Sequence, residues 1–396
     1  INAWQQAAEQ LNIESRALIN GRHVDALSGN TRPTLNPANG KLLADVASCA
    51  AEDADLAVKG AREAFEDGRW SRMAPAERKA VMVRWAALIE ANADELALLE
   101  CLDVGKPISD TTGVDVPAAV RTIRWSGEAI DKVYDEIAPT PHGSLALVQR
   151  LPLGVVAAIV PWNFPLSTTA WKLAPALATG NSVVLKPASN TPLSAIRLAG
   201  LASEAGLPDG VLQVLPGPGG SLGKHLAMHM DIDGLTFTGS TPVGQLLMQY
   251  AGQSNLKRTF LELGGKSPNI VFADANLDKA AAMAAVAVFY NGGQTCTAGT
   301  RLIVQDNVID EFMEKVTSHA GRWMPGDPLN PKTRMGPMVD QGQYETVAEY
   351  VDIGRREGAE LCFGGGRVMS DSGGWYHEPS IFTGVDNQMR IAQEEI

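Results

Sequence analysis

Two segments of the sequence carry side chains suited to covalent catalysis. Cys296 follows a glycine-rich stretch, Gly292-Gly293-Gln294-Thr295, that comes directly after an apolar segment with helical spacing. Glu262 stands between Leu261 and Leu263, where a carboxylate could be desolvated and then take a proton near neutral pH. A nucleophile and a base on separate loops are the minimum for covalent catalysis followed by hydrolysis. The two segments therefore predict an enzyme that works through a covalent intermediate.

Each candidate residue also has a purely structural interpretation. Cysteine is commonly a buried packing residue, although the glycines beside Cys296 would let a ligand approach the backbone closely. Glu262 could be a solvated carboxylate at a strand edge, paired with Lys257 or Arg258. Asn163, in a turn between a strand and a helix, could cap that helix or donate its amide hydrogens to a developing oxyanion. The local sequence does not separate these alternatives.

Composition limits the class of protein. A chain of 396 residues is too long for one ordinary core, so two or three domains are expected. The net charge of −12 argues against nucleic acid or an anionic membrane as the main partner, and no apolar run reaches membrane-spanning length. The four cysteines have no CxxC pair and the six histidines have no metal-ligand spacing. We therefore expect no metal site, a reducing cytoplasm, and packing roles for Cys49, Cys101 and Cys362.

The pattern of apolar residues changes along the chain. Residues 1–50 predict a short helix and hairpins, and residues 51–135 predict helices that include 53–65, 75–102 and 115–134. Short apolar strands then alternate with helices, which predicts a parallel, doubly wound sheet. The expected strands of this sheet are 155–160, 182–186, 211–215 and 234–237. A second α/β unit is expected after Leu263, with strands at 269–272 and 301–304 and helices at 277–289 and 309–322.

Ligands of doubly wound sheets bind at the carboxyl ends of the strands. Three turns are expected there, at 161–165, 186–189 and 238–241. The last of them, Thr238-Gly-Ser-Thr241, opens a helix whose free N–H groups and dipole could hold a pyrophosphate. Gly217, Gly219 and Gly223 do not have the GxGxxG spacing, so a standard Rossmann fingerprint is absent.

Six segments in this order and spacing resemble the aldehyde dehydrogenase superfamily over essentially the whole chain. Residues 124–135 and 154–161 look most like the γ-glutamyl-γ-aminobutyraldehyde and 4-guanidinobutyraldehyde dehydrogenases. The resemblance implies an α/β fold with a cofactor-binding domain over 1–262 and a catalytic domain over 263–396. It also implies an oligomerisation hairpin near 136–152 and a catalytic domain that continues beyond Ile396 in family members. The six segments are Pro161-Trp-Asn-Phe-Pro165, Lys186-Pro, Phe237-Thr-Gly-Ser-Thr241, Leu261-Glu-Leu-Gly-Gly-Lys266, Gly293-Gln-Thr-Cys296 and Glu394-Glu-Ile396.

The resemblance also implies a role for each motif residue. Cys296 would attack the aldehyde as a thiolate, and the Asn163 side chain and the Cys296 N–H would hold the oxyanion. Hydride would pass to NAD or NADP, and Glu262 would then activate water to release the acid. Lys186 would bind the adenosine ribose and Glu395 the nicotinamide ribose. The remaining residues expected around the cofactor are Val160, Pro161, Trp162, Ser189, Gly219, Gly223, Phe237, Thr238, Gly239, Ser240, Val243, Leu263 and Gly264.

One departure from the family concerns the cofactor. Many NAD-preferring members carry Glu where Ser189 stands, and that carboxylate repels a 2′-phosphate. Ser189 beside Lys186 removes the repulsion, so we expect use of both NAD and NADP. The resemblance further implies a cytoplasmic homodimer or homotetramer that acts on a small-molecule aldehyde.

The aldehyde itself is less constrained by the sequence. A cationic tail would need a carboxylate or an aromatic face, and Asp115 and Trp171 are candidates. Their structural alternatives are a helix N-terminal acid and a packed aromatic ring. Three other functions also stay open: an acylating dehydrogenase that uses coenzyme A, a non-catalytic nucleotide-binding protein, and a cysteine hydrolase. The base Glu262 argues against the first, every catalytic residue against the second, and the lack of a suitably placed histidine against the third.

Overall fold

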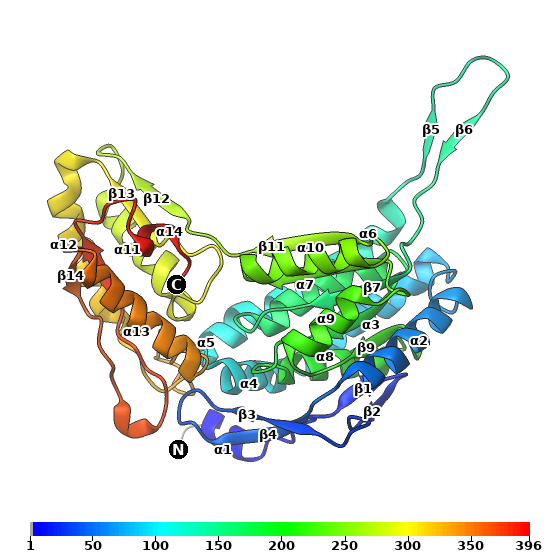
Figure 1. Ribbon diagram of the computed structural model, residues 1–396, viewed down its shortest axis with the longest axis horizontal. Coiled ribbons are helices and arrows are strands. Elements are labelled where there is room, and N and C mark those ends of the chain that lie inside the picture. Colours follow the sequence, from blue (N-terminus) through cyan, green and yellow to red (C-terminus); the bar gives the residue numbers. More distant parts are fainter. Residues whose placement is uncertain (1–2) are drawn as a thin grey trace.

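A seven-stranded sheet organises the larger body of the protein in the computed structural model, which describes residues 3–396 (Figure 1). Five of its strands are parallel and adjacent in the order β11-β10-β7-β8-β9, and β1 and β2 extend this sheet antiparallel at one edge. The predicted doubly wound parallel sheet is therefore confirmed. The strands are β1 (Ala17–Ile19), β2 (Arg22–Val24), β7 (Val155–Ile159), β8 (Ser182–Lys186), β9 (Leu212–Val214), β10 (Gly234–Gly239) and β11 (Arg258–Leu263).

Helices cover both faces of this sheet because its central strands are apolar on both sides. Every residue of β7 and β8 is buried. Val155, Ala157 and Ile159 pack into one core with α2 and α9, whereas Ala158 packs on the opposite face with α7 and α8. The alternation follows from the period of two residues in a strand. The helices are α2 (Ala51–Glu66), α9 (Lys224–Met228) and α10 (Thr241–Gln253) on the first face, and α3 (Pro75–Ala91), α4 (Ala93–Val104), α6 (Val116–Ala129), α7 (Pro165–Ala178) and α8 (Leu193–Glu204) on the second.

The helical run predicted for 75–102 is two helices, not one. Asn92 lies between α3 and α4 with φ −110° and ψ 28°, outside the helical region. Its side-chain nitrogen donates to the Leu88 main-chain oxygen at 2.7 Å. A side chain that bonds its own backbone competes with the helical pattern, and this competition explains the break.

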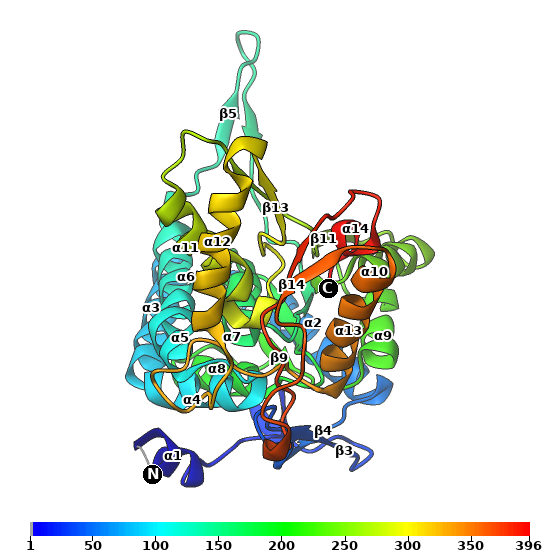
Figure 2. The same ribbon diagram turned by 90° about the vertical axis from the view of Figure 1, so that its left-hand side faces the viewer.

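The amino-terminal segment agrees with the prediction of a helix and hairpins. It contains α1 (Ala3–Glu9), the β1–β2 hairpin, and a second hairpin of β3 (Thr31–Leu35) and β4 (Leu42–Ala47). Asn20 and Gly21, in the first turn, both have positive φ, of 51° and 76°. Another antiparallel hairpin, β5 (Glu136–Ala138) and β6 (Ala146–Val148), projects far from the rest of the molecule in both views (Figures 1 and 2).

Residues after β11 form a smaller body beside the first (Figure 1). The strands and helices predicted between 269 and 322 are present there, and the elements after residue 340 were not anticipated. The two bodies meet where Ile108 N–H donates to the Pro328 oxygen at 2.8 Å and Trp375 N–H donates to the Pro37 oxygen at 3.2 Å. The elements are parallel β12 (Pro268–Val271) and β13 (Arg301–Val304), antiparallel β14 (Glu360–Phe363) and β15 (Ile381–Thr383), α11 (Leu277–Phe289), α12 (Ile309–Ala320), α13 (Gln341–Arg356) and α14 (Arg390–Gln393).

The predicted packing role is right for two cysteines and wrong for the third. Cys49 and Cys101 are buried, whereas Cys362 is exposed. Side chains of β14 alternate between exposed and half-buried, and Cys362 falls on the exposed face. Among residues 3–396, no helix has both the length and the apolar character needed to cross a membrane.

Candidate active site

The turn after β7 and the loop that carries Cys296 are joined by two hydrogen bonds. The Asn163 side-chain nitrogen donates to the Gln294 main-chain oxygen at 2.9 Å, and the Asn291 side-chain nitrogen donates to the Asn163 oxygen at 3.0 Å. The N-cap of α7 is Phe164, so the helix-cap interpretation of Asn163 is wrong. Asn163 therefore lies beside the loop that carries Cys296, although the two residues are far apart in the sequence.

The backbone before Cys296 needs its glycines. Asn291, Gly292 and Gly293 have φ of 53°, 66° and 80°, a left-handed run that glycine adopts without strain. Gln294 then locks the bend, since its side chain donates to the Asn291 oxygen at 2.8 Å and accepts from the Val339 N–H at 2.9 Å. The bend thus holds Cys296 at a fixed position.

Cys296 is half-buried at this bend. Burial is the main cause that raises the pKa of its thiol, and the nearby charges of Glu262 and Glu395 raise it further. Free cysteine titrates near pH 8.5. The thiol in this structure therefore stays protonated around neutral pH, and its activation needs a cation, a base or a hydrogen-bond donor.

Glu262 lies on β11, the edge strand of the sheet. Residues of β11 alternate between exposed and half-buried, and Glu262 is on the exposed face. The desolvation that its apolar neighbours suggested is therefore not found. Leu261 and Leu263 point to the other side of the strand, so they do not dry the carboxylate.

Lys186 and the glycine-rich turn form one side of the expected cofactor site. The Lys186 ammonium group donates to the Gly217 oxygen at 3.1 Å, and the Ser189 hydroxyl donates to the same oxygen at 2.9 Å. A Cβ added to Gly219 or Gly223 would lie 4.0 or 3.8 Å from the Lys186 side chain. Burial first, and the charge of Arg32 second, lower the pKa of Lys186 to about 8. An anion beside this lysine would favour its charged form.

The start of α10 forms a second side of the cofactor site. Ser240 is its N-cap and makes no side-chain capping bond, and Pro242 has no N–H, so the first turn can offer the N–H groups of Thr241 and Val243 to a ligand. A Cβ on Gly239 would lie 2.4 Å from the Phe237 ring, so a larger residue here would require that ring to move. Val243 is exposed on the first turn.

A third part of the expected site brings Gly264 against Glu395. A Cβ on Gly264 would lie 1.6 Å from a Glu395 carboxylate oxygen, so glycine is required for this approach. Burial raises the pKa of Glu395. The neighbouring Leu263 packs on α10 at Gly244, where a Cβ would lie 2.7 Å from the leucine.

The segment from Val160 to Trp162 runs along the carboxyl edge of the sheet. Val160 N–H donates to the Lys186 oxygen at 3.2 Å. The Trp162 oxygen accepts from the Thr191 hydroxyl at 3.2 Å. Pro161 lies between them and is half-buried. These contacts place the turn before Asn163 beside the Lys186 turn.

The two expected substrate residues lie in very different surroundings. Asp115 is fully buried, and both its carboxylate oxygens lie 3.1 Å from the Lys106 ammonium group. The alternative of an acid at a helix start does not hold either, because Asp115 ends a π-helical turn, Thr111–Asp115, that runs directly into α6. Trp171 is 56% exposed on α7, so it is not a packed core aromatic. Trp171, not Asp115, can meet a ligand without rearrangement.

Lys172 lies near Glu262, and the sequence argument did not anticipate this neighbour. Its ammonium group donates to the Thr236 hydroxyl at 3.0 Å, and burial lowers its pKa to about 8. The negative charge of Glu262 acts on it in the opposite direction, so the two side chains are close. The sequence contains one indication of this role. Lys172 is the single charged residue between Phe164 and Gly180, and a charged side chain that is buried needs a polar or charged partner.

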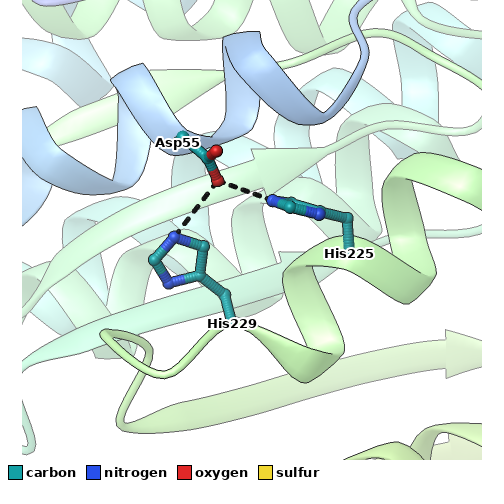
Figure 3. Close-up of side chains that lie close together, drawn as sticks. All are labelled: Asp55, His225 and His229. Carbon is teal, nitrogen blue, oxygen red and sulfur yellow. Dashed lines mark hydrogen bonds and ion pairs between the residues drawn. The ribbon is translucent and has the colours of Figure 1, made fainter.

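A separate cluster joins α2 to α9 (Figure 3). One oxygen of Asp55 lies 2.6 Å from Nε2 of His225 and 3.4 Å from Nε2 of His229. The Asp231 N–H donates to Nδ1 of His229 at 3.1 Å, so the neutral imidazole carries its proton on Nε2. That nitrogen faces the Asp55 carboxylate at 3.4 Å with its N–H and has no lone pair to offer a cation. We therefore interpret the cluster as a polar clamp between the helices.

Comparison with known proteins agrees with this arrangement. The Aldehyde dehydrogenase family profile matches residues 23–396. The NADP/NAD-dependent aldehyde dehydrogenase PuuC of Escherichia coli K12 is 50% identical over 394 residues, which cover 99% of this chain and 79% of that protein. A crystal structure of an indole-3-acetaldehyde dehydrogenase in complex with NAD+ superposes with a TM-score of 0.98, at 58% identity, and covers 99% of this chain and 79% of that one.

A second solved structure matches the subgroup expected from the sequence. The γ-glutamyl-γ-aminobutyraldehyde dehydrogenase of Burkholderia cenocepacia J2315 has a TM-score of 0.97 at 53% identity, again over 99% of this chain and 79% of that one. The family profile covers most of the chain, and the sequence identities are far higher than those of proteins that share only a fold. The chain therefore belongs to the aldehyde dehydrogenase family.

Proposed function

We propose that this NAD(P)-dependent aldehyde dehydrogenase oxidises an amino- or γ-glutamylamino-aldehyde to its carboxylic acid through a cysteine thiohemiacetal and a thioester. The observation that carries the proposal is the joining of the Asn163 turn to the Cys296 loop by hydrogen bonds of 2.9 and 3.0 Å. A thiol and an amide donor held together in this way are what nucleophilic attack on a carbonyl requires.

The residues present fit a nicotinamide dinucleotide. The uncapped start of α10 suits a pyrophosphate, Lys186 and Ser189 suit the adenosine ribose, and the close approach of Glu395 to Gly264 suits the nicotinamide ribose. When NAD(P) is bound, its nicotinamide accepts the hydride that the aldehyde carbon loses.

In the proposed mechanism Cys296 forms the bond to the aldehyde carbon. The thiol gives up its proton to solvent water on attack, and the carbonyl oxygen becomes an oxyanion. One N–H of the Asn163 amide is engaged by the Gln294 oxygen, and its second N–H is free to hold that oxyanion. The Cys296 main-chain N–H is the second proposed donor.

Release of the acid is assigned to Glu262. The carboxylate takes a proton from water, the water oxygen attacks the thioester carbon, and the Cys296 sulfur leaves as the thiolate. Exposure of Glu262 leaves room for this water. Lys172, which is electrostatically coupled to Glu262, is placed to stabilise its negative charge. A water-activating base supports hydrolysis over transfer to coenzyme A, the alternative within enzymes.

We further propose a domain division at residues 1–262 and 263–396, and assembly as a homodimer or homotetramer in the cytoplasm. The β5–β6 hairpin supports assembly, because Ile137 and Leu147 are 73% and 60% exposed on it. A catalytic thiol suits a reducing compartment. Light scattering of the intact chain beside an Ile137→Ser, Leu147→Ser variant tests the assembly, and an unchanged mass would reject the hairpin.

The function is tested by absorbance at 340 nm with γ-aminobutyraldehyde-type, indole-3-acetaldehyde and simple aliphatic aldehydes. NAD and NADP are supplied separately, without coenzyme A, and the acid is measured. Cys296→Ala should abolish the signal, whereas Cys362→Ala, a matched change of an exposed thiol, should preserve it. A signal that survives in Cys296→Ala, or the absence of acid product, would overturn the proposed mechanism.

A further inference from the structure

Arg32 is an exposed residue of β3 that points toward the Lys186 turn. The β3–β4 register is regular from Thr31 to Thr34, so Arg32 and Thr34, two residues apart, share one face of the strand. The Thr34 hydroxyl donates to the Asn190 main-chain oxygen at 3.2 Å, and Asn190 directly follows Ser189. This face of β3 therefore lies against the turn from residue 186 to residue 190.

The electrostatics agree with this placement. The charge of Arg32 contributes to the lowered pKa of Lys186, so the two cations are close enough to repel each other. Among residues 3–396, the Arg32 guanidinium takes part in no ion pair and no side-chain hydrogen bond. Two cations therefore lie near this turn, and position 189 carries a serine and not a carboxylate that would repel an anion. This arrangement favours the binding of an anion.

We propose that Arg32, together with Lys186 and Ser189, binds the 2′-phosphate of NADP and is a residue that sets the choice between NADP and NAD. The inference rests on the proposed function, because it places the adenosine ribose at Lys186. A planar guanidinium can form two parallel hydrogen bonds to a phosphate. The Ser189 hydroxyl, now donating to the Gly217 oxygen, can rotate to donate to the same phosphate.

Binding of NADPH and NADH tests the proposal without any turnover, since the two ligands differ only in the 2′-phosphate. Quenching of tryptophan fluorescence gives both dissociation constants for the wild type, Arg32→Gln, Arg32→Lys and Arg22→Gln. Arg22 is an exposed arginine on β2, so its change to Gln alters the net charge equally at another place. Adenosine 2′,5′-bisphosphate and 5′-AMP, as competitors, confine the comparison to the adenosine end.

We expect Arg32→Gln to raise the dissociation constants of NADPH and the bisphosphate by roughly 10- to 100-fold. The dissociation constants of NADH and 5′-AMP should stay within about twofold of the wild-type values. Arg32→Lys should retain part of the affinity, and Arg22→Gln should match the wild type. Added salt should lower the affinity for NADPH more in the wild type than in Arg32→Gln. Unchanged thermal unfolding confirms that the variants are folded.

Three results would overturn the proposal. If Arg32→Gln weakened the binding of NADPH and NADH equally, Arg32 would support the structure of the site and not recognise the phosphate. If it weakened the binding of neither ligand, Arg32 would be remote from the phosphate. If no variant and not even the wild type bound either ligand, the proposed cofactor site itself would be wrong. The last result is distinguishable from the first two, because in those the wild type still binds NADH.

Discussion

The Asn163 side chain and the Gln294 backbone are joined by a 2.9 Å hydrogen bond that connects the two bodies of the protein beside the Cys296 loop. The bond uses one of the two N–H groups of the amide and fixes the direction of the other. Because Gln294 is itself bonded to the Val339 N–H, the donor and the Cys296 bend are held by one network. The site is therefore preorganised by contacts between segments that are far apart in the chain.

Removal of the Asn163 amide should impair catalysis far more than stability. We expect Asn163→Ala to lower kcat by about 100- to 1000-fold, the usual effect of losing one oxyanion donor. Steady-state kinetics and urea unfolding check this. Asn276→Ala is the matched control, because Asn276 caps α11 through a bond to the Lys279 N–H. The control should lose about 1 kcal/mol of stability and keep its activity, and the reverse pattern would remove Asn163 from the chemistry.

The reactivity of Cys296 should depend on the charge of Glu262. The negative carboxylate disfavours the thiolate and contributes to the raised pKa of the thiol. Glu262→Gln should therefore lower this pKa and speed alkylation by iodoacetamide between pH 7 and pH 8.5. The rate is followed by intact mass, in a Cys362→Ala background to silence the exposed thiol. Slower alkylation of the Gln variant would instead mean that Glu262 accepts the thiol proton.

The buried ammonium group of Lys172 should make stability depend on pH. Its pKa is lowered from 10.5 to about 8, so between these values the unfolded chain binds more protons than the folded chain. Stability attributed to this group therefore rises with pH through that window. We expect Lys172→Met to be more stable than the wild type at pH 7, and the advantage should shrink from pH 8 toward pH 10.5. Urea unfolding at pH 7, 8, 9 and 9.5 measures it, and a constant difference would contradict the expectation.

Substitution of Asp115 should lower stability, whereas substitution of Trp171 should raise KM. Asp115→Asn leaves Lys106 with Glu100, at 3.6 Å, as its one remaining ion-pair partner among the described residues, and should cost about 3 kcal/mol of unfolding free energy. Trp171→Ala changes an exposed side chain, so stability should shift by only about 0.5 kcal/mol while KM for the aldehyde rises. Chemical denaturation and KM measurements on both variants separate the roles. A stable Asp115→Asn protein with a raised KM would restore Asp115 as a substrate contact.

Much of the site was predictable because the relevant signals are local. The glycines before Cys296 and at Gly239 are favoured by backbone angles or close contacts that a short segment imposes on itself. The alternation of apolar strands and helices likewise follows from burial of β7 and β8 on both faces. In each case the residues of a short segment determine its backbone conformation, whatever the segment contacts in the folded protein.

Other features depend on what lies across a contact, and the sequence prediction of them was incomplete or wrong. Glu262 is exposed because β11 is an edge strand, and Cys362 is exposed because it is on the outward face of β14. Asp115 is buried with Lys106 as its ion-pair partner, and Lys172 of α7 donates to Thr236 of β10. None of these partners could be chosen from spacing along the chain.

The sequence by itself thus determined the fold class and indicated the candidate nucleophile and the residues that follow each parallel strand, since periodicity and backbone conformation are properties of neighbouring residues. The tertiary structure decided which of those residues meet, how much water reaches each carboxylate, and which cations share a turn. Desolvation and Coulomb interactions act between groups that are close in space. The fold places Arg32 near Lys186 despite their like charge, and it places Asn163 beside Gln294, so both relationships exist only in the folded chain.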